Sequence, residues 1–230
     1  MQKYFEKHET AISILLIVIY ILTNSLCMQN FGETDYRSVI VNSILSLGVI
    51  LFIVKNKLGE YYGLTKFPKF KEFLYFIPLL ILMSVNLWSG VHINNTPAEI
   101  ILYILFMICV GFLEEIIFRG FLFKMMAKDN VNTAIIVSSL TFGIGHIINL
   151  FNGADLIPTL IQVCYAVAGG YLFVIIFQKG KSLWPCIIAH ATINSLSIFG
   201  IENEISTYIA PVFLILISVS YAMYLRRTKE

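Results

Sequence analysis

Charged residues are scarce in this sequence. Only 13% of its 230 residues are Asp, Glu, Lys or Arg and 58% are hydrophobic, whereas an ordinary soluble domain has roughly 25% charged residues. The composition excludes a basic nucleic-acid-binding surface and favours a chain embedded in a lipid bilayer. No polar stretch is long enough to form a second, soluble domain.

Cysteine-based and familiar zinc motifs are also absent. The four cysteines, Cys27, Cys109, Cys164 and Cys186, are widely spaced in apolar segments and form no C-x-x-C pair. Such residues behave as small buried hydrophobic side chains, so the sequence predicts neither a disulfide framework nor a cysteine zinc site. It contains no H-E-x-x-H motif and no internal repeat.

Long apolar runs dominate the chain, and a helix needs ~20 mostly apolar residues to cross a bilayer. The predicted spans are Ala11–Cys27, Ser38–Val54, Phe73–Trp88, Pro97–Lys124, Thr133–Ile148, Leu156–Phe177, Leu183–Phe199 and Thr207–Leu225. We therefore predict an all-α, polytopic integral membrane protein of about eight transmembrane helices with an intramembrane active-site cavity. Within this one membrane domain we distinguish residues 1–96 (helices 1–3), a core at 97–199 (helices 4–7), and 200–230 (helix 8 and a basic cytoplasmic tail).

Lysine and arginine are distributed unevenly between the predicted loops. Of the 16 such residues, 14 lie at the two ends or in the second, fourth and sixth loops, Arg37 lies on the opposite side, and Arg119 lies inside a span. Because cytoplasmic loops carry the excess of basic residues, both termini are predicted to lie in the cytoplasm.

The fourth span contains three ionisable residues in the stretch Gly111–Phe121, G-F-L-E-E-I-I-F-R-G-F. An ionisable group at the middle of a membrane helix costs at least ~2.5 kcal/mol, so such groups need partners or a function. Glu115 and Arg119 are four residues apart on a helix and can form an ion pair. Glu114 is turned about 100° away and has no partner in its own helix. We interpret Glu114 as the group available for chemistry.

Two further pairs of side chains occur at the spacing that projects them from one helix face. Phe142 and His146 lie in the fifth span, and His190 and Asn194 lie in the seventh. Counted from the helix ends, these residues and Glu114 reach overlapping depths, within ~10–20 Å of the cytoplasmic side. Alone, either histidine could be structural, and Asn194 could link two helices by hydrogen bonds. Together they predict one cavity shared by three helices.

A carboxylate and imidazoles around one cavity are suited to hydrolysis. A buried glutamate can act as a general base, an imidazole can position water, and His and Asn can donate hydrogen bonds to an oxyanion. No serine, cysteine or aspartate at this depth completes a nucleophilic triad.

The motifs E-E-x-x-x-R (Glu114–Arg119), F-x-x-x-H (Phe142–His146) and H-x-x-x-N (His190–Asn194) resemble those of the CPBP family. This family comprises type II CAAX prenyl proteases and bacteriocin-processing enzymes, and is also called the Abi family. The resemblance covers roughly Pro97–Ser197 and implies an eight-helix intramembrane endopeptidase whose cavity opens toward the cytoplasm. It implies that Glu114 activates water with His146 as its partner and that His190 and Asn194 form the oxyanion site. Glu115, Arg119 and Phe142 would support them.

The resemblance leaves metal dependence open, because the family has been described both as metal-dependent and as a group of glutamate proteases. A divalent metal such as zinc, if present, would be bound by Glu114, His146 and His190. The residues alone serve either mechanism.

Two other functions are compatible with the sequence. One is a non-catalytic CPBP-type scaffold in bacteriocin immunity or envelope regulation, although all motif residues are intact. The other is a transporter with a proton relay, although no inverted repeat is present. For a protease we expect a bacterial plasma membrane as the location. Its expected substrates are peptides or small membrane proteins, as in bacteriocin maturation or self-immunity.

Overall fold

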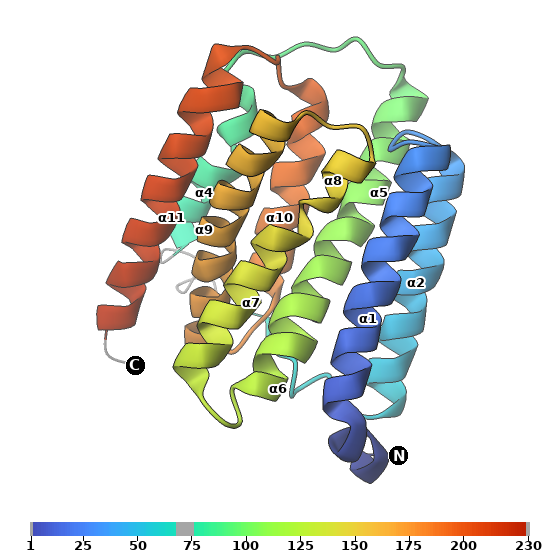
Figure 1. Ribbon diagram of the computed structural model, residues 1–230, viewed down its shortest axis with the longest axis vertical. Coiled ribbons are helices and arrows are strands. Elements are labelled where there is room, and N and C mark those ends of the chain that lie inside the picture. The colour runs from blue at the N-terminus through green and yellow to red at the C-terminus, as the bar shows by residue number, and fades with distance from the viewer. Residues whose placement is uncertain (1, 68–75, 229–230) are drawn as a thin grey trace.

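The computed structural model describes residues 2–67 and 76–228, and this part of the chain is a bundle of helices (Figure 1). The longer helices are α1 (Gln2–Asn30), α2 (Tyr36–Lys55), α5 (Pro97–Glu115), α7 (Val131–Gly145), α9 (Leu156–Gly180), α10 (Trp184–Leu196) and α11 (Ala210–Arg227). The shorter ones are α4 (Ile77–Met83), η2 (Val85–Leu87), η3 (Ile116–Phe123), α6 (Lys124–Met126), α8 (Ile148–Phe151), η4 (Ser197–Phe199) and η5 (Ile205–Ile209). The prediction of an all-α polytopic membrane protein is confirmed.

Six helical segments among the described residues are long and apolar enough to cross a membrane. The predicted seventh span corresponds to a shorter apolar segment, Trp184–Phe199. The predicted third span, Phe73–Trp88, begins outside the described residues, and from Phe76 onward it contains α4 and η2. The count of eight spans therefore stays a prediction.

Local sequence signals explain where the helix α5 begins. Thr96 and Glu99 form a capping box, in which each side chain binds the backbone N–H of the other residue. Pro97 occupies the first turn, where a missing N–H leaves no hydrogen bond unmade. The helices α2 and α7 begin in a similar way. Asp35 and Asn130 directly precede these helices, and their side chains accept hydrogen bonds from backbone N–H groups of the first turns.

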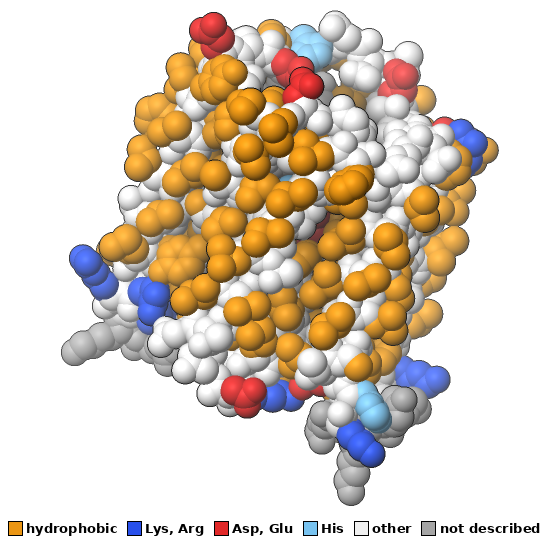
Figure 2. Space-filling model, viewed as in Figure 1, with side chains coloured by type: hydrophobic (Ala, Val, Ile, Leu, Met, Phe, Trp, Pro, Cys, Tyr) orange, Lys and Arg blue, Asp and Glu red, His pale blue; other side chains and the backbone are white. Residues whose placement is uncertain are grey.

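The two chain ends lie at the same end of the bundle, which we call the terminal end (Figure 1). The connectors after α2, α6 and α9 also lie there, and they contain lysines. Figure 2 shows Lys and Arg side chains along this end of the molecule. The opposite end, formed by the connectors before α2, α5, α9 and α11, is called the distal end. Among the described residues of this end, Arg37 is the only lysine or arginine, and it forms an ion pair of 2.8 Å with Asp35.

The terminal half of the bundle is densely packed with aromatic side chains. Phe121 is fully buried and its ring lies 4.7 Å from that of Tyr62, 6.0 Å from that of Phe52 and 6.4 Å from that of Phe5. Burial of such large side chains is the main source of stability in a packed core. This half fixes the relative positions of α1, α2 and η3.

Glycine allows α7 and α9 to approach closely. A Cβ atom on Gly143 would lie 2.3 Å from Cγ2 of Val167 and 2.9 Å from the carbonyl oxygen of Val163, so no larger residue fits there without displacement. Small residues of this kind typically line helix contacts in membranes. The contact sets the position of α7, which carries Phe142 and leads into His146.

Candidate active site

The helix that carries the two glutamates changes its geometry directly after them. α5 ends at Glu115 and continues as the π-helix η3, Ile116–Phe123, whose side chains are all buried. π-helical turns are rare and are frequently found at functional sites. No feature of the sequence predicted this change of helix type.

Glu115 and Arg119 form the predicted ion pair, with 3.1 Å between Oε1 and Nη1 and no exposure of either side chain. The guanidinium carbon of Arg119 lies 4.1 Å from the centre of the Phe142 ring and 5.6 Å from that of Phe173. A buried cation is thus balanced by one carboxylate and by two aromatic faces. Gly170 leaves the space for it, because a Cβ there would lie 3.2 Å from Nη2 of Arg119.

Glu114 obtains its partners from two other helices. The hydroxyl of Tyr20 on α1 donates a hydrogen bond of 2.6 Å to Oε1 of Glu114. Nε2 of His190 on α10 lies 3.2 Å from the other carboxylate oxygen, Oε2. Glu114 is therefore held from both sides.

His190 connects the two adjacent glutamates. Its Nδ1 donates a hydrogen bond of 2.8 Å to Oε1 of Glu115, while its Nε2 faces Glu114. The imidazole is mostly buried, and the rings of Phe142 and Phe173 lie beside it at 5.6 and 5.9 Å. These contacts couple the ion pair to Glu114, since one side chain contacts both carboxylates.

His146 faces the same cavity but has a different partner. Its Nδ1 lies 3.0 Å from the carbonyl oxygen of Phe142, one helical turn earlier. Because a carbonyl can only accept, Nδ1 carries the proton there and Nε2 of the neutral ring is an acceptor. The resemblance paired Glu114 with His146, whereas the imidazole in direct contact with Glu114 is that of His190.

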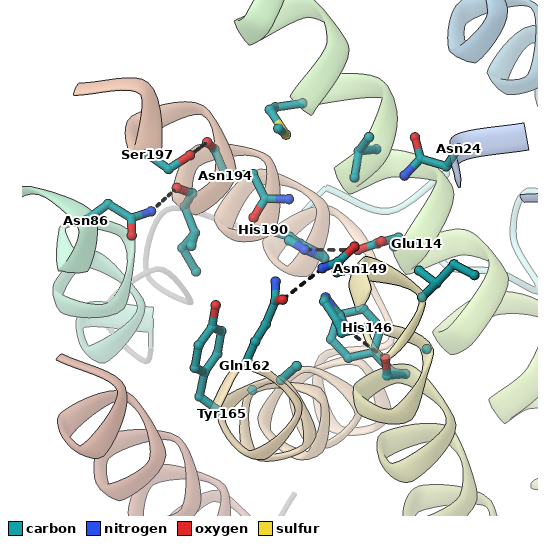
Figure 3. A pocket seen from close by; sticks show the side chains of 18 of the residues that line it. Asn24, Asn86, Glu114, His146, Asn149, Gln162, Tyr165, His190, Asn194 and Ser197 are labelled. Carbon is teal, nitrogen blue, oxygen red and sulfur yellow. Dashed lines mark hydrogen bonds and ion pairs between the residues drawn. The ribbon is translucent and has the colours of Figure 1, made fainter. Parts of the chain in front are cut away.

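A cavity of about 390 Å³ contains these groups. Glu114, His146, His190 and Asn194 all line it, and Figure 3 shows them around one space. Several other carboxamide side chains line it as well: Asn24, Asn86, Asn149, Asn152 and Gln162. Asn149 donates to Oε1 of Gln162 at 2.8 Å. A cavity rich in such donors and acceptors can bind the backbone of an extended peptide.

The cavity lies in the distal half of the bundle. In α10, the residues that line the cavity begin at His190. In α9, they end at Phe173, and the last turns of α9 belong to the packed half of the bundle. On the other side of Arg119, the side chains of Phe121 and Leu183 have no exposed surface. The side of the membrane from which the cavity is reached stays a prediction.

The residues do not form a metal site as they are arranged. No three His, Cys, Asp or Glu side chains gather closely enough to hold a metal ion in the described part of the chain. Both ring nitrogens of His190 face carboxylates, and Nδ1 of His146 is occupied by a carbonyl. A zinc ion bound by Glu114, His146 and His190 does not fit this donor arrangement, so no chemical step is assigned to one.

Tyr20 and Asn24 on α1 are site residues that the sequence analysis missed. They lie four residues apart, the same spacing that drew attention to His190 and Asn194, and both line the cavity. The amide of Asn24 also contacts the Tyr20 hydroxyl at 3.4 Å. Their spacing was a usable signal, but a tyrosine in an apolar span is ordinarily an interfacial anchor.

The fold and the site define a polytopic membrane protein with a polar, glutamate-containing cavity inside its helix bundle. Residues 96–196 match the model of a family described as type II CAAX prenyl endopeptidase, Rce1-like. The matched segment contains all three motifs, and the match bears out their resemblance to the CPBP family. No curated protein matches the chain. The match begins after α1, so Tyr20 and Asn24 lie outside it.

Proposed function

We propose that this protein is an intramembrane endopeptidase that cleaves membrane-associated peptides or small membrane proteins with a water molecule activated by Glu114. The observation that carries the proposal is the carboxylate of Glu114, held by Tyr20 and His190 at the wall of a polar cavity inside the bundle. An ionisable group kept at that depth is a functional residue by default. The family match supports the same reaction class.

In the proposed reaction, Glu114 takes a proton from water while the water oxygen attacks the carbonyl carbon of the substrate peptide bond. The amide N–H groups of Asn194 donate to the oxyanion that forms. The C–N bond then breaks, and the proton held by Glu114 passes to the leaving amine. Nε2 of His146, an acceptor facing the cavity, orients the attacking water.

Glu115 and Arg119 act through His190 and do not contact the substrate. The ion pair fixes Oε1 of Glu115, this oxygen accepts from Nδ1 of His190, and the imidazole thereby presents Nε2 to Glu114. A carboxylate that orients the far side of a catalytic imidazole is a recurrent arrangement in hydrolases. We assign Glu115, Arg119 and Phe142 positioning roles.

The test is cleavage of membrane-associated candidate peptides by the purified protein and its variants. Glu114→Gln preserves the shape of the side chain but cannot accept a proton from water, so cleavage is expected to disappear while the protein stays folded. His146→Ala is expected to be about as severe, because a base and the group that orients its water act as a unit. Glu202→Gln, in the connector before α11, is the matched control and should cleave normally.

Substantial turnover by a folded Glu114→Gln protein would contradict the protease assignment. The non-catalytic scaffold would then be the better description of the protein. The same assay with a chelator present tests the metal alternative directly. We expect no loss of activity, because both ring nitrogens of His190 and Nδ1 of His146 already have partners.

A further inference from the structure

The segment that follows His146 places two asparagines at the cavity. The short helix α8, Ile148–Phe151, contains Asn149, and Asn152 directly follows it. Both asparagines line the cavity together with His146. The backbone N–H of Asn149 donates to the carbonyl oxygen of His146 at 3.0 Å, so this segment lies within one helical turn of His146.

The segment is held in place from two sides. On one side, the hydroxyl of Ser25 on α1 donates to Oδ1 of Asn152 at 2.6 Å, and Nε2 of Gln29 donates to the same oxygen at 3.2 Å. On the other side, Nδ2 of Asn149 donates to Oε1 of Gln162 on α9 at 2.8 Å. Groups that are fixed before a ligand arrives lose little conformational freedom when they bind it.

The bond between Asn149 and Gln162 leaves an acceptor and a donor of this pair available. A carboxamide has an accepting oxygen and two N–H donors. Within the described part of the chain, no group donates to Oδ1 of Asn149. The side chain of Tyr165 contacts the carboxamide of Gln162 and occupies at most one of its two N–H groups. Both carboxamides are half-buried, and Figure 3 shows them joined at the wall of the cavity.

An available acceptor beside an available donor matches the backbone of an extended peptide. In a strand, the N–H and the C=O of one residue point to the same side and are bonded as a pair by an antiparallel neighbour. In an α-helix, the same groups are bonded within the segment. No lysine or arginine of the described residues lines the cavity, so neutral groups of this kind are its main binding groups.

We propose that Asn149 and Gln162 form a backbone clamp for an extended peptide. In this clamp, Oδ1 of Asn149 accepts from the N–H of one peptide residue, and Nε2 of Gln162 donates to the C=O of the same residue. Groups one helical turn apart are separated by ~5 Å, and an extended chain advances ~3.3–3.6 Å per residue. Because His146 lies within this distance of the clamp, the clamped residue lies within about two positions of the scissile bond. The register relative to the scissile bond rests on the proposed protease function, whereas binding of an extended peptide does not.

The first test compares two peptides on the Glu114→Gln protein, which binds without cleaving. The probe is a capped, dye-labelled peptide of alternating leucine and alanine, and the comparison peptide carries a methyl group on every backbone nitrogen. Fluorescence anisotropy in detergent gives Kd for both, with detergent alone as the blank. The peptide with intact N–H groups is expected to bind about fivefold more tightly, the scale of one net hydrogen bond.

Variants then assign this preference to the clamp. Asn149→Leu removes the acceptor and should abolish the preference, whereas Asn149→Asp keeps an acceptor oxygen and should retain it. Asn95→Ala, outside the cavity, is the matched control and should retain it too. Gln162→Met, an apolar substitution in an apolar helix, is the second variant and should weaken the preference, because Asn149 is then no longer held.

Three outcomes would overturn the proposal. They are an unchanged preference in folded Asn149→Leu and Gln162→Met proteins, no preference in the parent protein, and no binding of either peptide. Unfolding temperatures of the same samples identify any variant that fails to fold.

Cleavage separates this proposal from the proposed function. On a peptide that the purified protein cleaves, single N-methyl groups are placed at successive residues. One position within about two residues of the scissile bond should lose cleavage in the native protein and lose much less in Asn149→Leu. Binding with the expected preference but without cleavage would contradict the protease assignment and leave the clamp in place. Cleavage in which no position depends on Asn149 would do the opposite.

Discussion

The two halves of this bundle differ in construction although the same helices run through both. In the terminal half, aromatic rings from α1, α2 and η3 fill the interior, and Tyr62 and Phe121 have no exposed surface. In the distal half, the helices enclose a cavity lined by carboxamides, two histidines and Glu114. A packed core and a polar cavity thus occupy successive layers of one bundle.

The two adjacent glutamates lie at the boundary between these layers. Glu114 lines the cavity, whereas Glu115 has no exposure and pairs with Arg119 in the packed layer. His190 contacts both carboxylates and so connects the layers. Substitutions in the packed layer should therefore lower the stability of the protein, whereas substitutions at the cavity should lower its turnover.

The largest expected effect is on the packed side. Arg119→Ala leaves Glu115 as a buried carboxylate without its cation, which should lower the free energy of unfolding by ~3–5 kcal/mol. Thermal unfolding of the purified protein in detergent measures the loss. Arg37→Ala, which breaks an exposed pair, is the control and should leave the stability almost unchanged. A stable but inactive Arg119→Ala protein would assign Arg119 to the chemistry instead.

On the cavity side, Asn194→Ala should slow cleavage without unfolding the protein. Loss of one oxyanion donor raises the barrier by ~2.7–4 kcal/mol, a decrease of about 10²–10³-fold in turnover. The measurements are kcat on one purified substrate and the unfolding temperature of the same sample. Asn95→Ala, outside the cavity, should leave both unchanged. A marked fall in unfolding temperature for Asn194→Ala would indicate that the asparagine links helices instead.

Tyr20→Phe should have a smaller effect on turnover. It removes the hydrogen bond to Oε1 of Glu114 and leaves the ring in place. A hydrogen bond to a charged group contributes ~1.5–3 kcal/mol, so kcat is expected to fall by roughly 13-fold to 160-fold. KM should change little, because the hydroxyl contacts the base and not the substrate. Unchanged kcat would show that His190 alone is sufficient to orient Glu114.

The sequence contained most of the information needed for the fold class and the motif residues. Ionisable residues are costly in a bilayer, so Glu114, Glu115 and Arg119 stood out, and the four-residue spacing predicted the ion pair that is present. Helical spacing also predicted that His146, His190 and Asn194 share one cavity, and all three line it. These predictions succeeded because each depends on a single helix and its depth.

The features that escaped prediction depend on contacts between helices. The bond from Tyr20 to Glu114 joins residues 94 positions apart, and no local pattern specifies it. His190, and not His146, contacts Glu114 because α10 packs closely against α5. A Cβ on Gly111 of α5 would lie 2.8 Å from the backbone nitrogen of Ala191 on α10. The depth of residues along single helices also could not show which half of the bundle contains the cavity.

Two glycines at the boundary give the finest test of the difference between packed and hollow regions. A Cβ on Gly143 would meet Val163 and Val167, whereas one on Gly169, which lines the cavity, would have no atom within 4 Å. Gly143→Ala should therefore destabilise the protein by ~1–3 kcal/mol through overpacking. Gly169→Ala should be neutral or stabilise it by up to ~1 kcal/mol, because alanine is favoured over glycine inside a helix. Unfolding temperatures of the two variants give the comparison, and equal losses in both would show that the space beside Gly169 is filled.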